Sequence, residues 1–401
     1  MPLPIAAICH DHPAEASQVR IVMLSVIHPP FDVRIFYKEA LTAARAGHAV
    51  SVIALSEERE QMVDGIRIVG LPPTRSRWGR PLNWLRLFRR AIRERADVYH
   101  FHNLELLPWG VLLQWVTGKA AIYDAHEHFP SKVLVRPWIP AWVRPLVGRL
   151  VYRLEPFFAR AVAATLTADH LTAAGLGQRG VHPVVTLYNY PRLEVCAPPN
   201  PDHLSDLPSA PTLLFIGTLG PDRGLWTMLD TMACLRETHR MAARLVVVGD
   251  AKLAGLVEQI EARIAELGLS QAVSLEGYVP HDALAAYLRQ AHLGFMAYDP
   301  AICERNIPTK MFEYMAAGLP IITTRADMTA FFLDQTPAGI MVDSQRPEAY
   351  AQAIVDLWAD PARLREMARA GRQAFESRYH WESEGEKLLA LYERLSPGQR
   401  G

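Results

Sequence analysis

Short apolar segments alternate with amphipathic ones along most of this 401-residue chain. The apolar segments RIVMLSVI (20–27) and HAVSVIALS (48–56) flank residues 33–46, whose apolar side chains recur at helical spacing. Continuous apolar runs are typical of strands covered on both faces, and strand–helix–strand units build parallel sheets. Because the alternation continues at 97–103, 120–127, 164–170 and 183–189, we predict a Rossmann-like domain over 20–195.

A segment without periodicity interrupts this alternation. Residues 196–211, CAPPNPDHLSDLPSAP, are rich in Pro, Asp and Ser, which is typical of an interdomain linker. The pattern resumes at TLLFIGTLG (212–220) and ends in a long amphipathic stretch. We therefore predict an α/β protein with a leader over 1–19, a second Rossmann-like domain over 212–375 and a C-terminal helix over 376–401 that can cross back to the first domain. Ligands of such sheets bind at the carboxyl ends of the strands, here facing a cleft between the two domains.

Charge and composition narrow the classes of partner. The 42 basic residues balance the 42 acidic ones, so net charge gives no argument for a nucleic-acid partner. The cysteines lie far apart and do not form a zinc-ligand set: Cys9, Cys196, Cys234 and Cys303. The chain shows no secretory signal and no run of about 18 apolar residues. We expect a cytoplasmic protein, with contact at most to the inner face of a membrane.

A glycine-rich turn in the second domain has the features of a phosphate site. In LLFIGTLGPDRGLWTMLDTM, the glycines Gly217, Gly220 and Gly224 lie between a strand and a helix and let the backbone approach a ligand. The start of the helix offers free N–H groups, and Arg223 can add a charged hydrogen bond to a phosphate. The alternative interpretation is an ordinary tight turn between a strand and a helix.

A second candidate is the segment NIPTKMFEYMAAGLPII (306–322). Pro308 suits the start of a helix, and Lys310 and Glu313 then lie on nearly the same face. A lysine in the first turn opposes the helix dipole unless an anion binds there, whereas Glu313 can accept hydrogen bonds from two adjacent hydroxyls of a ribose. The alternative is a surface salt bridge.

Histidines follow several strands of the first domain. They are His28, His100, His102 and His126, the last beside Asp124, Glu127 and His128. We interpret the H-x-H and H-E-H spacings as placing side chains on alternating faces, so that they do not converge on a metal. A polar wall that touches a sugar fits these residues better. We expect His126 to lie nearest the reacting sugar.

The motifs, in their order along the chain, resemble those of glycosyltransferase family 4, a group of retaining enzymes of the GT-B fold. The resemblance runs from about residue 20 to 395 and rests on HPPFDVRIFYKEALTAARAGHAVSVIAL, DVYHFHN, YDAHE, LLFIGTLGPDRGL, RLVVVGD, VSLEGYVPHDALAAYLRQAHLGFM, PTKMFEYMAAGLPII and SRYHWESEGEKLLALYERL. It implies that the first domain binds the acceptor and the second a nucleotide-sugar, with UDP favoured over GDP.

The resemblance also implies residue roles. It assigns catalysis to His126, Arg223 and Lys310, and the acceptor side to His28, Asp32 and Arg34. The implied donor site comprises Gly217, Thr218, Gly220, Gly277, Tyr278, Val279, Glu304, Asn306 and Glu313. The sequence departs from the family pattern in two places. Arg305 stands where the first glutamate of E-x7-E is usual, with Glu304 one residue early, and Thr218 replaces the first basic residue of the phosphate motif.

Several functional alternatives remain open on the sequence. No Asp-x-Asp stands at a strand end, so we expect no metal and no cofactor, and the resemblance implies retention of configuration. A nucleotide-sugar epimerase would use Asp124 and Glu127, and a non-catalytic nucleotide-sugar-binding protein would explain the displaced Glu304. A dehydrogenase is disfavoured, because no acidic residue follows a true G-x-G-x-x-G.

Two arginine-rich segments bear on the acceptor. Residues 73–97 and 138–158 combine arginines with apolar side chains, as helices that lie on anionic lipid do. Such contact would suit a lipid-linked glycan in bacterial polysaccharide or glycoconjugate synthesis. The alternative is that both segments are ordinary helices that cover the sheet.

Overall fold

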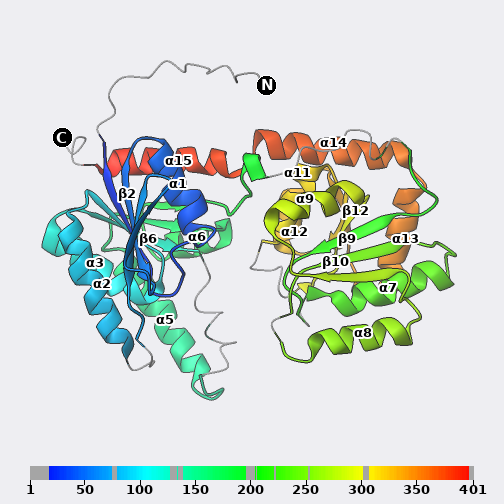
Figure 1. Cartoon of the computed structure of the whole chain (residues 1–401), viewed down its shortest axis with the longest axis horizontal. Coiled ribbons are helices and arrows are strands. Elements are labelled where there is room, and N and C mark those ends of the chain that lie inside the picture. Colours follow the sequence, from blue (N-terminus) through cyan, green and yellow to red (C-terminus); the bar gives the residue numbers. More distant parts are fainter. Residues whose placement is uncertain are drawn as a thin grey trace, which may run out of the picture. The chain divides into compact units, whose positions relative to one another are not determined.

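A computed structural model describes residues 18–74, 79–126, 133, 139–195, 204, 206–220, 223–251, 253–300 and 307–396. These residues form two compact units (Figure 1). The N-terminal unit contains the described residues up to Thr167, residues Ala173–Val185 and those from Lys387 onward, and the C-terminal unit contains Ala168–Thr172 and Thr186–Glu386. Most of the predicted leader and more than half of the predicted linker lie outside the described residues.

The N-terminal unit is built on an eight-stranded sheet of order β3-β4-β2-β1-β5-β6-β7-β8. The strands are β1 Arg20–Leu24, β2 Ala49–Leu55, β3 Glu60–Val63, β4 Ile66–Leu71, β5 Val98–Phe101, β6 Ala120–Ala125, β7 Ala164–Thr167 and β8 Val184–Thr186. In this order, each strand from β4 through β2, β1, β5 and β6 to β7 pairs in parallel with the next one. Strand β3 pairs with β4 in antiparallel fashion. The order reverses between β1 and β5, which makes their carboxyl ends a switch point where ligands of such sheets bind.

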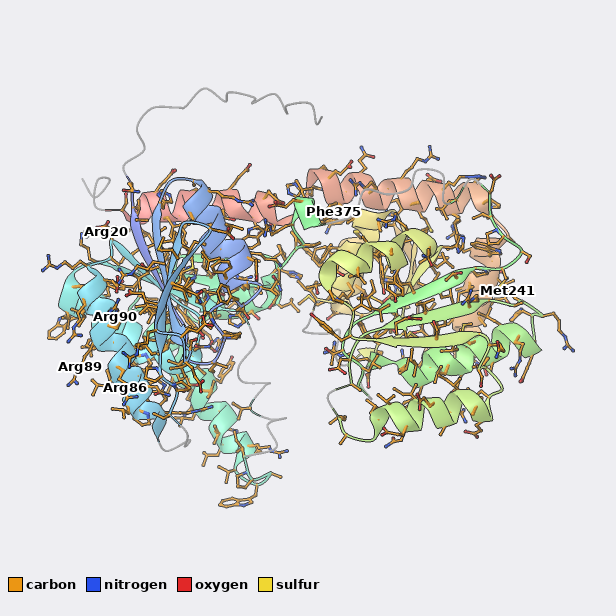
Figure 2. All side chains as sticks on the ribbon, in the orientation of Figure 1. Arg20, Arg86, Arg89, Arg90, Met241 and Phe375 are labelled. Carbon is orange, nitrogen blue, oxygen red and sulfur yellow. The ribbon has the colours of Figure 1, made fainter. Side chains whose placement is uncertain are left out.

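Helices cover both faces of this sheet. Helices α2 (Arg80–Glu94), α3 (Leu107–Thr117) and α5 (Arg144–Ala159) pack side by side against one face. The π-helical turn η1 (Ile35–Ala40), α1 (Leu41–Arg45) and the end of α15 (Trp381–Leu395) lie on the other, and α6 (His170–Gln178) follows β7 (Figure 1). The outer face of α2 is basic, with Arg86 and Arg89 pointing away from the sheet (Figure 2).

The C-terminal unit contains a six-stranded parallel sheet of order β11-β10-β9-β12-β13-β14. The strands are β9 Thr212–Ile216, β10 Arg244–Val248, β11 Val273–Gly277, β12 Leu293–Met296, β13 Ile321–Thr324 and β14 Gly339–Val342. The helices are α7 Leu225–Glu237, α8 Leu256–Glu266, α9 His281–Gln290, α11 Lys310–Ala317, α12 Asp327–Leu333, α13 Pro347–Trp358 and α14 Pro361–Ser377. Here the order reverses between β9 and β12, so their carboxyl ends form the switch point of this unit.

The C-terminal stretch divides into two helices. The structure ends α14 at Ser377 and begins α15 at Trp381, whose amide donates to the carbonyl of Pro191 (2.8 Å). Up to Glu386, α15 belongs to the C-terminal unit, and from Lys387 it belongs to the N-terminal unit. The last helix therefore returns to the first domain. None of the helices formed by the described residues combines the length and the apolar character that crossing a membrane requires.

Candidate functional site

Three glycines end the adjacent strands β9, β10 and β11 of the C-terminal unit. The Gly217 amide donates to the carbonyl of Val248 (2.9 Å), and the Gly249 amide donates to that of Gly277 (2.8 Å). A Cβ added at Gly249 would lie 1.8 Å from the Gly217 carbonyl oxygen, so the two chains pass in direct contact. The sequence analysis missed Gly249, although RLVVVGD ends a strand in the same way as LLFIG. Because glycine has no side chain, a ligand can approach the backbone closely at the carboxyl ends of these three strands.

The start of α7 packs closely against the chain that follows β12, at the same end of the sheet. Gly224 precedes α7 with a φ of +71°, and a Cβ there would lie 1.7 Å from the Ala297 carbonyl oxygen, just beyond β12. The N-cap residue of α7 is this glycine, which has no side chain to cap the first amides of the helix, and amides in this position bind anions. The guanidinium of Arg223 lies 5.7 Å from the centre of the Tyr298 ring, beside the same turn. Thr218 is exposed there, and Gly220 accepts from the Arg223 amide (3.0 Å).

Helix α11 brings Lys310 and Glu313 to the same switch point. Tyr314 fixes the helix on β9, because its hydroxyl accepts from the Ile216 amide and donates to the Leu214 carbonyl, both at 3.0 Å. Gly294 of β12 makes room for the Tyr314 ring, since a Cβ there would lie 2.4 Å from it. The sequence analysis did not identify this role of the tyrosine in the K-x-x-E-Y pattern.

The predicted pair of Lys310 and Glu313 is present. The Lys310 ammonium donates to Glu313 Oε1 (2.9 Å). Glu313 Oε2 is buried and has no hydrogen-bond partner among the described residues. A buried acceptor without a partner is costly, so this oxygen is ready to receive a hydroxyl from a ligand.

The remaining predicted donor residues lie at two other positions. Gly277 ends β11 with a φ of +67°, Tyr278 is 77% exposed and Val279 packs against the core of the unit. Backbone atoms of this turn therefore lie at the same carboxyl end of the sheet. Glu304 and Asn306 lie outside the described residues.

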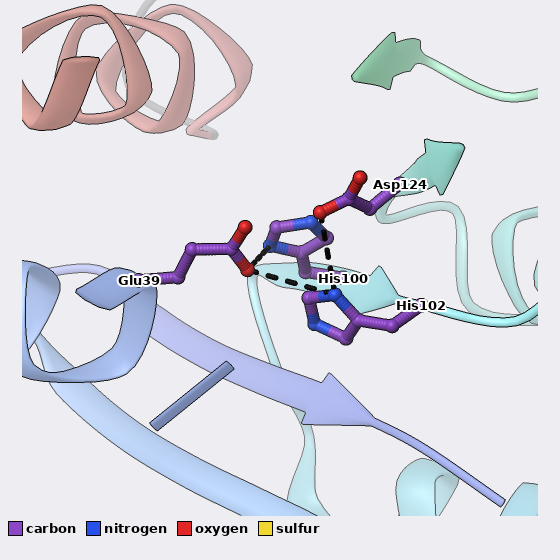
Figure 3. A group of neighbouring side chains, drawn as sticks. All are labelled: Glu39, His100, His102 and Asp124. Carbon is purple, nitrogen blue, oxygen red and sulfur yellow. Dashed lines mark ion pairs between the residues drawn. The ribbon is translucent and has the colours of Figure 1, made fainter. Parts of the chain in front are cut away.

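The histidines of the N-terminal unit converge, and our interpretation of their spacing was wrong. Residues two apart in a strand share a face, so His100 and His102 point the same way, with ring centres 4.4 Å apart. They meet Glu39 and Asp124, and all four side chains are fully buried (Figure 3). His102 Nδ1 lies 3.4 Å from Asp124 Oδ2 and 3.5 Å from Glu39 Oε2. Burial lowers the pKa of both histidines, because it disfavours the charged ring.

Glu39 reaches this cluster through an unusual turn. In η1 the Glu39 amide donates to the Arg34 carbonyl five residues earlier (3.0 Å), as in a π-helix. Such turns are frequent at functional sites. Asp32 begins the turn by accepting from the amides of Arg34 (2.8 Å) and Ile35 (3.1 Å). Burial raises the pKa of Asp32, but the hydrogen bonds from His28 and these amides outweigh it and bring the pKa well below its usual range.

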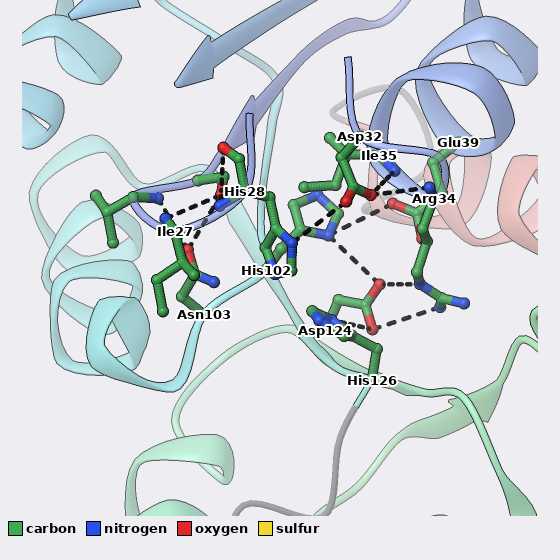
Figure 4. Close-up of polar contacts among 12 residues, drawn as sticks. Ile27, His28, Asp32, Arg34, Ile35, Glu39, His102, Asn103, Asp124 and His126 are labelled. Atoms are coloured by element: carbon green, nitrogen blue, oxygen red, sulfur yellow. Dashed lines mark hydrogen bonds and ion pairs between the residues drawn. The ribbon is translucent and has the colours of Figure 1, made fainter. Parts of the chain in front are cut away.

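Arg34 points into the cluster. Its Nε lies 2.8 Å from Asp124 Oδ2 and 2.9 Å from Glu39 Oε1, and the side chain is nearly buried (Figure 4). Although burial acts to raise the pKa of Asp124, the Arg34 guanidinium holds it well below its usual range. For Glu39 burial prevails, and its pKa is raised well above the usual range. Arg34 thus orders the floor of the site.

His126 and His28 form the partly exposed layer above this floor. Their ring centres lie 5.1 Å apart, and His28 Nδ1 is 3.3 Å from Asp32 (Figure 4). Burial lowers the pKa of His126 to about 4, so its ring is neutral at physiological pH. Asn103, which the sequence analysis missed, fixes the loop after β1 by accepting from the Val26 amide (2.9 Å). Glu127 and His128 lie outside the described residues.

Comparisons with known proteins match both units to sugar-transferring enzymes. A family described as glycosyl transferase 4-like domain matches residues 37–190, and one described as glycosyl transferases group 1 matches residues 210–360. A D-inositol 3-phosphate glycosyltransferase of Segniliparus rotundus is 32% identical over 186 residues, which are 46% of this chain and 40% of that protein. The chain thus spans less than half the length of this relative.

Solved structures share the fold across both units. Sucrose-phosphate synthase from Thermosynechococcus elongatus has a TM-score of 0.75 at 18% identity, covering 94% of this chain and 99% of that one. Anabaena HepE in complex with UDP-glucose has a TM-score of 0.70 at 13% identity, covering 93% and 99%. These likenesses confirm the predicted pair of Rossmann-like units of the GT-B fold.

Proposed function

Because the chain belongs to the group 1 glycosyltransferases, with an N-terminal domain of the glycosyl transferase 4-like type, we propose that it transfers a sugar from a nucleotide-sugar to a glycan or lipid-linked glycan. One observation carries the proposal. At the β9/β12 switch point, strand-end glycines, the start of α7 and the Lys310–Glu313 pair combine an anion site with a buried acceptor, Glu313 Oε2, that has no partner among the residues that the structure describes. A nucleoside diphosphate presents both complementary groups.

The diphosphate would lie at the start of α7, between Arg223 and Lys310. Departure of the nucleoside diphosphate concentrates negative charge on its terminal phosphate, and two cations with the helix amides stabilise that charge without a metal ion. The ribose hydroxyls would donate hydrogen bonds to Glu313 Oε2, and the base would lie along residues 277–279. We favour a uracil base, with guanine second, because a protein of the same fold binds UDP-glucose.

The N-terminal unit would supply the acceptor side. We propose that the neutral His126 ring hydrogen-bonds a hydroxyl of the sugar. We also propose, from the family resemblance, that configuration is retained: the acceptor hydroxyl attacks the anomeric carbon from the side on which the phosphate leaves, and the leaving phosphate takes the acceptor proton. The epimerase alternative needs a free acid or base at Asp124. Its carboxylate is buried and bound to Arg34, which argues against that role.

A transfer assay tests the function. UDP- and GDP-sugars are incubated with EDTA, with and without lipid-linked glycan acceptors, and released nucleotide and the anomeric configuration of the product are measured. We expect release that depends on the acceptor, with retained configuration. Conversion of the donor without acceptor would indicate an epimerase, and donor binding without turnover across the acceptor panel would indicate a binding protein.

We also propose that the N-terminal unit rests on anionic lipid at the inner face of the membrane. Helix α5 and the turn before it expose a stripe of large apolar side chains, here called the α5 stripe, consisting of Trp142 (85% exposed), Leu146 (67%), Leu150 (53%) and Phe157 (62%). Arg149 and Arg153 are exposed on the same helix. Helix α2 exposes Arg86, Arg89 and Arg93, and α3 lies between α2 and α5, in contact with both. A basic, amphipathic surface of this kind binds phospholipid headgroups with its apolar side chains inserted.

Replacing Leu146 and Leu150 together by glutamine should weaken binding to phosphatidylglycerol vesicles more than tenfold. Each buried methylene contributes about 0.8 kcal/mol to membrane binding, and the double change removes several of them. Vesicle cosedimentation at low and high salt measures the effect. The control is Leu253→Gln, which changes an equally exposed leucine of the C-terminal unit. Equal binding of all three proteins, or binding to uncharged vesicles alone, would contradict the proposal.

A further inference from the structure

We propose that Glu39, His100, His102 and Asp124 form a binding site for one divalent transition-metal ion. Each side chain offers one ligand atom, and these atoms all lie within 4.8 Å of one another (Figure 3). The ligands come from η1, β5 with the loop that follows it, and β6, at the β1/β5 switch point. The site is separate from the donor site of the C-terminal unit, whose chemistry we derive without a metal.

The distances suit a small coordination sphere. His102 Nδ1 lies 3.4 Å from Asp124 Oδ2 and 3.5 Å from Glu39 Oε2. Ligands at about 2.0–2.1 Å around a tetrahedral zinc ion are separated by about 3.3 Å. A small contraction of the cluster would therefore place the ligand atoms around an ion.

Several buried polar atoms of the cluster have no hydrogen-bond partner among the described residues. Both carboxylate oxygens of Glu39, both ring nitrogens of His102 and Nε2 of His100 have no hydrogen-bond partner among them. Arg34 Nε is close to Glu39 Oε1 but lies outside hydrogen-bond geometry. Buried polar groups in proteins are almost always partnered, so several orphaned atoms that face one another indicate a bound species.

Charge favours a cation over a water molecule. The carboxyl groups of Glu39 and Asp124 both lie against the Arg34 guanidinium, and the Asp32 carboxylate acts electrostatically on Glu39. The neutral imidazole is the form of histidine that binds a metal, and the side chains of His100 and His102 are fully buried. A divalent ion that took the place of the proton on Glu39 would balance the two negative charges that then remain.

The surroundings also resemble those of a metal ligand. The Tyr392 hydroxyl of α15 lies 2.8 Å from His100 Nδ1, and Arg34 holds Asp124. Such outer contacts orient ligand side chains in metal sites. Two imidazoles and two carboxylates are a ligand set for Zn²⁺ or Mn²⁺, and we use Zn²⁺ as the probe. The ion would tie η1 to the sheet beneath His126.

Zinc titration of the chelator-stripped full chain tests the site. We expect wild type to bind one equivalent by calorimetry and to melt at a higher temperature with Zn²⁺. His102→Asn and Glu39→Gln should lose both effects. The matched control is His48→Asn, which removes another buried histidine of the same unit, outside the cluster. It should bind Zn²⁺ as wild type does.

A second measurement covers variants that fail to fold. Co²⁺ added to stripped wild type should give visible absorption bands of a nitrogen- and oxygen-ligated site, and Zn²⁺ should abolish them. Folded wild type that binds neither Zn²⁺, Co²⁺ nor Mn²⁺ would overturn the proposal, as would folded His102→Asn that binds Zn²⁺ as tightly as wild type. Nucleotide binding by the C-terminal unit is measured in parallel and should survive in all variants, so failure of this site is distinguishable from failure of the proposed function.

Discussion

Lys310→Ala should lower kcat/KM for sugar transfer roughly 100- to 1000-fold, the effect of removing one group that stabilises charge in a transition state. The lysine lies at the start of α11 and donates to Glu313. Its loss removes a cation from the leaving phosphate and leaves the Glu313 carboxylate uncompensated beside it. Steady-state assays with a saturating acceptor measure the change. Arg325→Ala, which removes a surface cation of the same unit that pairs with Asp334, should have little effect.

A double-mutant cycle separates the two causes of this loss. If Lys310 acts only by neutralising Glu313, Lys310→Ala should do little in a Glu313→Gln background. If Lys310 contacts the phosphate, the loss should persist in that background, which is the result that we expect. Near-normal transfer by the single Lys310→Ala variant would contradict the proposed donor site.

Gly224→Ala should destabilise the protein by about 3 kcal/mol or more and abolish nucleotide binding. A left-handed backbone costs a residue with a side chain roughly 1–2 kcal/mol, and forcing an atom into a packed site costs about 1–3 kcal/mol more. At Gly224 the added Cβ would lie 1.7 Å from the Ala297 carbonyl oxygen, so the start of α7 must move. Urea unfolding and nucleotide titration measure the two effects.

Gly255→Ala is the matched control for this prediction. Gly255 precedes α8 with a φ of +76°, close to the +71° of Gly224, but no atom lies within 4 Å of its added Cβ. We expect it to lose only the backbone contribution, about 1 kcal/mol, and to bind nucleotide normally. Equal destabilisation of the two variants would show that α7 is not held against β12 as described.

The order of most strands could be predicted from the sequence because buried parallel strands give short, continuous apolar runs, which alternate here with longer segments of helical spacing. The strands β3, β4 and β14 were not predicted. The turn between β3 and β4 carries Asp64 and Gly65, both with positive φ, a pair typical of hairpins. The Lys310–Glu313 pair was predicted because both residues lie within one helical turn, where spacing alone fixes which side chains meet.

Contacts between distant segments were beyond the sequence analysis. Glu39 joins His100 and Asp124 only because a π-turn on one element rotates it toward the ends of two later strands. Arg34 was assigned to the acceptor side, but its guanidinium is directed at buried carboxylates that no local pattern identifies. The role of Gly294, which admits the Tyr314 ring, likewise depends on the packing of α11 over β12.

The most direct test of the donor site is thermal unfolding of the wild type with UDP, GDP and ADP, each in EDTA and compared with EDTA alone. A ligand at about 100 times its Kd adds about 2.7 kcal/mol to the free energy of unfolding, which raises the melting temperature measurably. We expect one nucleoside diphosphate to stabilise the protein without a divalent ion. No stabilisation by any of the three, or stabilisation only when a divalent ion is added, would contradict a donor site built from Arg223, Lys310 and the start of α7.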